Sequence, residues 1–234
     1  MIVFHLTTLG DLLFSLPVLA AIRRGWPETR VVSAARAYLL PLLRVTGLAQ
    51  EALERPTSVG GKWRLMRALR RARFEMAICL AMSPETSLLA WLSGAKRRVG
   101  FAGAELARLL NELVPFDPPP SLLNNMKMLD HLALPRVADD YVGLVPEDTS
   151  AATRARDLLD AVGIDGPYMV VAPGAGARRR YKAWAPERFG LVARMLSAEY
   201  DWRVVTVGGA SEEQMAAAVR QECPLAVSLV GRTD

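Results

Sequence analysis

Residues 1–22, MIVFHLTTLGDLLFSLPVLAAI, hold the pattern that decides the fold of this chain. Met1 to Leu6 are mostly apolar and predict a short buried strand. Residues 7–10 predict a turn, and the leucine spacing after it predicts a helix from Asp11 to Arg24. Pro17 lies within that helix and marks either a kink or a later start. A strand that leads through a loop into a helix is the unit from which α/β folds are built.

The same alternation continues through the first part of the chain. Apolar runs predict further strands at residues 30–34, 75–80 and 98–101. Helical spacing predicts helices at residues 38–45, 62–73, 84–92, 105–111 and 122–132. Strands that alternate with helices are typical of a parallel sheet covered by helices on both faces.

The pattern restarts after residue 148. Helices are predicted at residues 150–162, 186–200 and 211–221, and strands at 168–172, 203–207 and 226–230. The sequence therefore predicts an α/β protein with two Rossmann-like domains, residues 1–148 and 149–234, that face a cleft. Because only three strands are predicted in the second domain, we expect that domain to be incomplete, with a free edge strand.

Composition excludes several classes of protein. Apolar residues make up 51% of the chain and charged residues 23%, which indicates a folded core rather than disorder. No apolar run reaches the ~18 to 20 residues of a membrane span, and the N-terminus lacks the basic region of a signal peptide. Cys79 and Cys223 lie in unrelated contexts, which is typical of a reducing compartment. We expect a cytoplasmic protein, with contact to the membrane surface as an alternative.

The net charge of +5 is modest, but the cations are clustered. They concentrate in residues 62–73, 96–98 and 178–182. Such clusters suit phosphates, anionic lipid or nucleic acid, and a solvated helix face is an equal alternative for the first two. No aromatic residues interleave with the cations in a stacking arrangement, so nucleic acid is not an expected partner.

Two loops follow the strands that open the two predicted domains, Thr7–Asp11 and Pro173–Lys182. Ligands of parallel sheets bind beyond the carboxyl ends of the strands, which singles out both loops. In the first loop Gly10 allows a ligand to approach the backbone, and Asp11 is expected at the head of a helix, where N–H groups can hold an anion. Helix capping by Asp11 is the simpler alternative.

The second loop combines small residues with cations. Gly174 and its neighbours give the backbone room, and Arg178, Arg179, Arg180 and Lys182 follow. This composition suits a diphosphate, and a charged loop without a ligand is the alternative. The loop has neither the G-x-x-x-x-G-K-[ST] order nor the G-x-G-x-x-G order.

A third segment, Gly208–Glu213, follows the next predicted strand. Its glycine pair and carboxylates could approach a ribose, and helix capping by Ser211 is an equal alternative. His5 and His131 are expected to be structural, and no cluster has the spacing of metal ligands.

Together these motifs resemble glycosyltransferase family 9, the lipopolysaccharide heptosyltransferases. Residues 9–11 (LGD) with 15–19 (SLPVL) resemble the family's opening LGD…LPAL motif. Residues 173–175 (PGA) with 182–189 (KAWAPERF) resemble its PGA…K-x-W…E-x-F motif, and 207–212 (VGGASE) is a weaker third match. The family's D-[ST]-G-x-x-H segment has no match in this sequence.

The resemblance implies two Rossmann-like domains in the GT-B arrangement and a metal-independent transfer of heptose from ADP-heptose to a lipid-linked oligosaccharide of the lipopolysaccharide core. No cofactor or metal is implied beyond the donor substrate. The implied residue roles are these: Asp11 is the general base; Gly174, Arg178 and Lys182 bind the donor diphosphate; Glu212 or Glu213 contacts its ribose; Thr8, Gly10, Lys62 and Arg64 bind the acceptor.

Two alternatives to this function stay open. One is a family 9 transferase that uses a different sugar and acceptor, since the motifs do not specify the sugar. The other is a truncated, non-catalytic remnant that binds anionic ligands.

Overall fold

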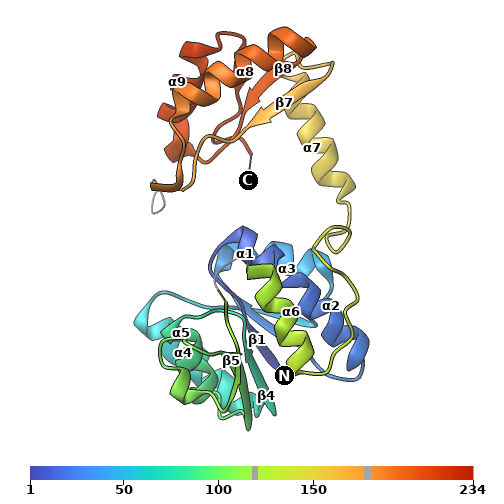
Figure 1. Cartoon of the computed structure of the whole chain (residues 1–234), viewed down its shortest axis with the longest axis vertical. Coiled ribbons are helices and arrows are strands. Elements are labelled where there is room, and N and C mark those ends of the chain that lie inside the picture. The colour runs from blue at the N-terminus through green and yellow to red at the C-terminus, as the bar shows by residue number, and fades with distance from the viewer. Residues whose placement is uncertain (118–120, 177–180, 234) are drawn as a thin grey trace. The chain divides into compact units, whose positions relative to one another are not determined.

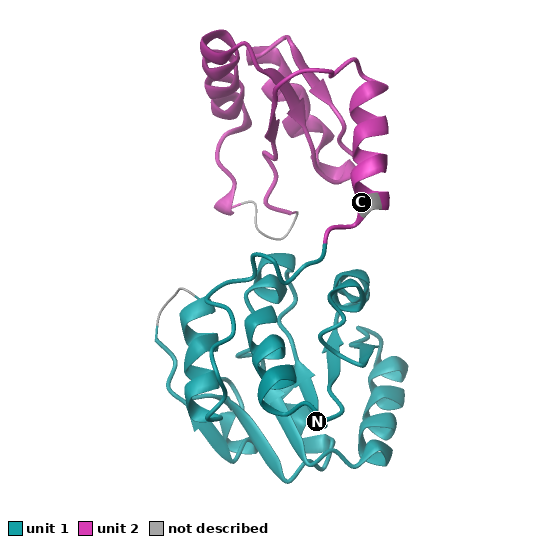
Figure 2. Cartoon of the chain, turned by 90° about the vertical axis from the view of Figure 1, so that its right-hand side faces the viewer, with its two compact units in different colours: residues 1–146 teal, residues 147–234 magenta. Residues whose placement is uncertain are grey.

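The computed structural model describes residues 1–117, 121–176 and 181–233. The chain forms two compact units, Met1–Pro146 and Glu147–Asp234 (Figure 2). The sequence analysis placed the division after residue 148, and the two compact units divide after Pro146; the next helix, Thr149–Asp160, lies in the second unit with either division.

Unit 1 is built on a six-stranded parallel sheet with the order β3-β2-β1-β4-β5-β6. Its strands are β1 Ile2–Phe4, β2 Val32–Ala35, β3 Glu51–Glu54, β4 Met76–Cys79, β5 Arg97–Phe101 and β6 Glu112–Val114. β1 lies at the centre, where Val3 is in register with Ser33 of β2 and Ile78 of β4. The strand order reverses between β1 and β4, and such a switch point is where ligands bind in doubly wound sheets.

Helices cover both faces of this sheet (Figure 1). They are α1 Leu9–Leu13, α2 Leu16–Gly25, η1 Ala37–Leu39, α3 Leu40–Thr46, α4 Val59–Ala72, α5 Pro84–Leu92, η2 Ala107–Leu109 and α6 Ser121–His131. Side chains of α2, α3 and α6 pack on one face, and those of α4 and α5 on the other. Successive residues of β1 alternate between the two cores, with Val3 in the first and Ile2 and Phe4 in the second.

The first predicted helix is two helices. α1 begins at Leu9, because the Thr8 side chain accepts a hydrogen bond from the Asp11 amide and so caps the helix. The expected capping by Asp11 is therefore wrong. The later start marked by Pro17 is confirmed, since Pro17 lies in the first turn of α2. The Asn125 side-chain amide donates to the Phe14 carbonyl at the break between the two helices, at 2.8 Å.

Three further differences from the sequence prediction lie in unit 1. Strands β3 and β6 were not predicted. The helix predicted at residues 105–111 is wrong: Leu106 has φ of 61°, a left-handed conformation that interrupts a helix, and a short 3₁₀ turn and β6 occupy the segment instead.

Unit 2 contains a three-stranded parallel sheet with the order β7-β8-β9. Its elements are α7 Thr149–Asp160, β7 Tyr168–Val171, α8 Pro186–Tyr200, β8 Arg203–Thr206, η4 Ala210–Glu212, α9 Glu213–Glu222 and β9 Ala226–Ser228. Residues of α8 and α9 pack on one face of this sheet, and α7 packs on the other. Two Rossmann-like α/β units, the second with a small sheet, agree with the predicted fold class.

Within the described residues, every helix falls short of the length and apolar character that spanning a bilayer requires. Cys79 and Cys223 are both free and buried, and burial raises the pKa of the Cys79 thiol to about 12.

Candidate functional site

The loop after β1 presents the Asp11 carboxylate at the switch point of unit 1. Asp11 is the third residue of α1 and is half-buried. The Thr8 hydroxyl donates a hydrogen bond to Asp11 Oδ2, and the Asp11 amide donates back to Thr8 Oγ1 at 3.3 Å. Gly10 is exposed, and a side chain at that position would meet nothing within 4 Å. The loop therefore holds a carboxylate in one orientation and leaves open space beside it.

Thr8 was predicted to contact the acceptor, which stays a prediction, and the structure shows a second role for it. Its hydroxyl contacts Asp11 and the α1 amide, so it positions the carboxylate directly. The backbone before it is also held, because the Tyr38 hydroxyl donates to the Thr7 carbonyl.

Four charged side chains meet at the carboxyl ends of the neighbouring strands, and we call them the Glu85 cluster. Glu85 Oε2 accepts from Arg36 at 2.8 Å and from Arg55 at 2.6 Å, and Glu85 Oε1 lies 3.2 Å from Lys62 Nζ. Three cations surround one carboxylate, so the cluster carries a formal excess of two positive charges.

Arg55 is the most buried member of the Glu85 cluster. Its Nη1 donates to the carbonyl of His5, the residue after β1, and its Nη2 donates to Glu85. Burial would raise the pKa of the Glu85 carboxyl, but the hydrogen bond and charge of Arg55, with Arg36 and Lys62, hold that pKa below its ordinary value. Glu85 is therefore ionised near neutral pH.

Lys62 and Arg64, which were predicted together, separate in the structure. Lys62 joins the Glu85 cluster, whereas Arg64 is exposed on α4 and takes no part in it. Arg36, Arg55 and Glu85 were not identified from the sequence. The signal for them was that Arg36 and Arg55 directly follow strands, where ligand-binding residues of parallel sheets collect, but β3 was not recognised as a strand.

His5 is a buried structural residue next to the loop and takes no part in its chemistry. Its ring lies in the core, with Nδ1 at 2.8 Å from Ser15 Oγ and Nε2 at 3.2 Å from Ser33 Oγ. Ser15 donates its own proton to the Leu12 carbonyl, so Nδ1 is the donor and Nε2 accepts from Ser33. Burial, reinforced by the charge of Arg55, lowers the pKa of His5 to about 3, and the ring is neutral.

In unit 2 the Glu212 side chain joins the loops after β7 and β8. Its carboxylate accepts from the Gly209 amide at 2.9 Å and from the Gly176 amide at 3.3 Å. A Cβ at Gly174 would lie 1.6 Å from Glu212 Oε1, so the absence of a side chain at Gly174 permits this contact. Glu212 therefore organises the backbone of both loops. Glu213 begins α9 and is exposed.

A cavity of about 160 Å³ opens beside this contact. It is lined by backbone and side chains of both loops and of α9, namely Ala175, Gly176, Ala183, Ser211, Glu212, Gln214 and Met215. Ser211 makes no side-chain capping bond. The turn begins at Gly209, whose amide donates a hydrogen bond to the Glu212 carboxylate. Capping by Ser211, the equal alternative for this segment, is therefore wrong.

Lys182 is exposed next to a segment that is anchored by aromatic packing. Trp184 packs edge-on against Phe189 of α8 with ring centroids 5.1 Å apart, and the Arg188 guanidinium lies 6.0 Å from the Trp184 ring centre. The packing of Trp184 holds the chain in place two residues after Lys182. The Lys182 side chain is exposed to solvent, and the next residue, Ala183, lines the cavity. Arg178, predicted beside Lys182, lies outside the described residues.

Among the residues that the structure describes, no three or more acidic, histidine or cysteine side chains are grouped so that they could hold a metal ion.

Comparisons with known proteins identify the family of this chain. The family model for glycosyltransferase family 9 (heptosyltransferase) matches residues 62–234, and the chain belongs to that family. Lipopolysaccharide heptosyltransferase 3 of Escherichia coli is 20% identical over 239 residues, which cover 95% of this chain and 69% of the relative.

Solved structures show the same fold. The E. coli ADP-heptose lipopolysaccharide heptosyltransferase II matches 99% of this chain with a TM-score of 0.75 at 19% identity, and 72% of that protein is covered. The family 9 glycosyltransferase of Veillonella parvula DSM 2008 matches 99% of this chain with a TM-score of 0.79 at 18% identity, and 68% of it is covered.

Proposed function

We propose that this chain transfers a heptose, or a related sugar, from an ADP-activated donor to a lipid-linked oligosaccharide such as the lipopolysaccharide core. Membership of family 9 and the names of its relatives support this substrate class. The observation that carries the proposal is Asp11, a half-buried carboxylate that Thr8 orients at the switch point of unit 1. A cytoplasmic location, where nucleotide-sugars are made, is part of the same proposal.

Asp11 would act as the general base. The acceptor hydroxyl gives its proton to Asp11 while its oxygen attacks the anomeric carbon of the donor. The bond from that carbon to the diphosphate oxygen breaks, and the diphosphate gains negative charge. Asp11 suits this role because its second oxygen atom, Oδ1, is left for the acceptor when Thr8 holds Oδ2.

Unit 2 would hold the donor diphosphate. Lys182 is an exposed cation that directly precedes Ala183, which lines the cavity between the two loops, and a cation at this place would stabilise the charge developing on a leaving diphosphate. We propose that Lys182 supplies this charge without a metal. The Glu212 carboxylate accepts hydrogen bonds from the Gly176 and Gly209 amides, so we propose that it mainly shapes the two loops. It would contact the ribose only through its remaining lone pairs.

The Glu85 cluster would receive an anionic group of the acceptor. Its excess positive charge is partly buried, which weakens screening by solvent and strengthens attraction for phosphate or carboxylate. Lys62 is its most exposed member and is therefore the residue best placed to reach the acceptor.

Replacement of Asp11 by Asn tests the proposal. Asn keeps the shape of the side chain but cannot take the proton, so ADP release in the presence of acceptor should fall by at least about a hundredfold. ADP affinity should not change, because the diphosphate is assigned to unit 2. Asp160→Asn, which removes an exposed carboxylate in α7, is the matched control and should retain full activity.

Two results would contradict this assignment. Full activity in Asp11→Asn would remove Asp11 as the base. Absence of sugar transfer by the unaltered chain, with ADP still bound, would favour the alternative of an anion-binding protein without catalysis.

A further inference from the structure

Helices α4 and α5 carry an exposed apolar surface on one flank of unit 1. The two helices pack side by side over the same face of the sheet (Figure 1). Val59 is 74% exposed, Trp63 58% and Leu88 40%, although each is a large apolar side chain. A cluster of such residues marks an interaction surface, whereas single exposed apolar residues need no explanation.

These side chains border a groove of about 380 Å³ between the helices. Its walls are mostly apolar, and they consist of Val59, Trp63 and Met66 from α4 with Leu88, Leu89 and Leu92 from α5. Lys62 and Glu85 also line it, so the groove adjoins the Glu85 cluster.

The same helix carries concentrated positive charge. Residues 59–73 contain six cations and no acidic residue. Within the described part of the chain, ion pairs involve Lys62 from this group but none of Arg64, Arg67, Arg70, Arg71 and Arg73. These five arginines are exposed, so their charge is directed to solvent without local compensation.

Aromatic and cationic side chains share one side of α4. Arg67 and Arg70 follow Trp63 by four and seven residues, a spacing that places all three on the same helical face. Arginine stems can lie along an apolar surface while their guanidinium groups stay at the level of phosphates. Tryptophan prefers that same interfacial level of a bilayer.

We infer that the α4–α5 surface of unit 1 rests on an anionic phospholipid bilayer. Val59, Trp63 and Leu88 enter the interface, and Arg67 and Arg70 contact lipid phosphates. A helix with an apolar strip, a tryptophan and uncompensated arginines binds through buried apolar area and attraction to anionic lipid together. A second copy of the chain fits less well, because it would bring the same positive charge against this surface.

Vesicle sedimentation with the full chain tests this inference. The protein should pellet with vesicles of mixed phosphatidylcholine and phosphatidylglycerol at about 0.1 M salt, where charges are screened over about 10 Å. It should bind vesicles of phosphatidylcholine alone at least about tenfold more weakly. No nucleotide or sugar is needed, so the result does not depend on the proposed transferase activity.

Three variants assign the binding to this surface. Trp63→Ala removes the exposed ring, and the double variant Arg67→Glu with Arg70→Glu reverses two charges; each should weaken binding at least about fivefold. Arg194→Glu with Arg220→Glu makes the same charge change at exposed positions of α8 and α9 in unit 2 and should bind nearly as the unaltered chain does.

Several outcomes would overturn the inference. They are no binding to anionic vesicles, equal binding to neutral vesicles, or unchanged binding by Trp63→Ala. An equal loss in the two double variants would show an effect of net charge alone. Dimerisation without vesicles that Trp63→Ala abolishes would show that a second copy covers the surface instead.

Discussion

Strands β1 and β7 open the two units with similar apolar sequences, IVF and YMVV, yet they differ in burial. β1 has β2 on one side and β4 on the other, and all three of its residues are buried. Among the described residues, β7 pairs with β8 alone, and its residues alternate between exposed and half-buried.

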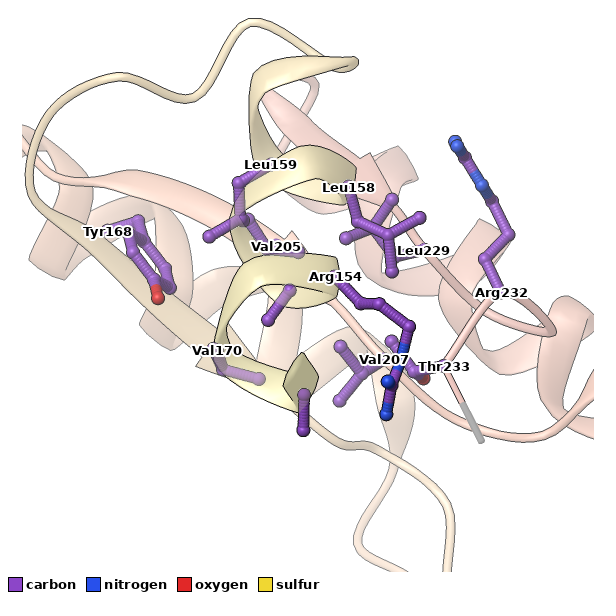
Figure 3. A pocket seen from close by; sticks show the side chains of 12 residues that line it. Arg154, Leu158, Leu159, Tyr168, Val170, Val205, Val207, Leu229, Arg232 and Thr233 are labelled. Carbon is purple, nitrogen blue, oxygen red and sulfur yellow. The ribbon is translucent and has the colours of Figure 1, made fainter. Parts of the chain in front are cut away.

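The side chains of β7 show where this difference arises. Met169 and Val171 pack against the core beneath α8 and α9. Tyr168 and Val170 point to the other face, where α7 is the packing partner and a hollow of about 320 Å³ remains (Figure 3). Leu158 of α7 and Val205 of β8 also line this hollow. The burial of an apolar strand is thus set by how fully both faces of its sheet are covered, and only secondarily by its own composition.

The largest expected difference between the units is in their response to acid. Both histidines of the chain lie in unit 1, and the pKa of His5 is lowered to about 3. An unfolded histidine titrates near 6.5, so below that pH the unfolded state binds a proton that the folded state rejects. The free energy of unfolding of unit 1 should fall by about 2.5 kcal/mol between pH 7 and 4.5.

Hydrogen-exchange mass spectrometry in urea can follow peptides from the two units separately. Peptides of β1 should lose protection across this pH range, and peptides of β8 should lose much less. His5→Asn removes the titrating group and should flatten the response of β1, although it lowers stability at pH 7. An unchanged pH response in that variant would rule out His5 as its source.

A matched pair of substitutions measures how much a valine side chain contributes to stability in β1 and in β7. Val3 is 0% exposed and Val170 is 56% exposed. Val3→Ala should destabilise unit 1 by about 2 kcal/mol, from lost apolar burial and the cavity it leaves. Val170→Ala should change the stability of unit 2 by less than about 0.5 kcal/mol. Urea unfolding measures both, and equal losses would contradict the difference in burial.

The sequence predicted elements best where a local signal set their ends. Helices α5 and α8 have the bounds that were predicted, and Pro84 and Pro186 at the first helical position of each explain where they begin. β3 escaped prediction because Glu51 and Glu54 flank just two apolar residues, a pattern tolerated at a sheet edge. The left-handed Leu106 that ends the predicted helix at 105–111 has no sequence signal of its own.

The residues of the candidate site also differ in whether the sequence could predict them. Asp11 could be predicted, because its motif and its place after β1 are local in the sequence. The Glu85 cluster could not, because its members come from four separated segments that meet through the strand order β3-β2-β1-β4. Glu212 was predicted as a ligand contact, but its bonds to Gly176 and Gly209 depend on the close approach of two loops.

In the proposed reaction, unit 2 binds the nucleotide and unit 1 supplies the base. Calorimetric titration of ADP into the chain and its variants measures whether these two roles are separate. ADP should bind the unaltered chain and Asp11→Asn equally, and Lys182→Ala should bind at least about tenfold more weakly, because a charged hydrogen bond to phosphate is lost. Lys96→Ala, at an exposed lysine of unit 1, is the control and should bind normally. Absence of ADP binding, or equal binding by Lys182→Ala, would contradict the account.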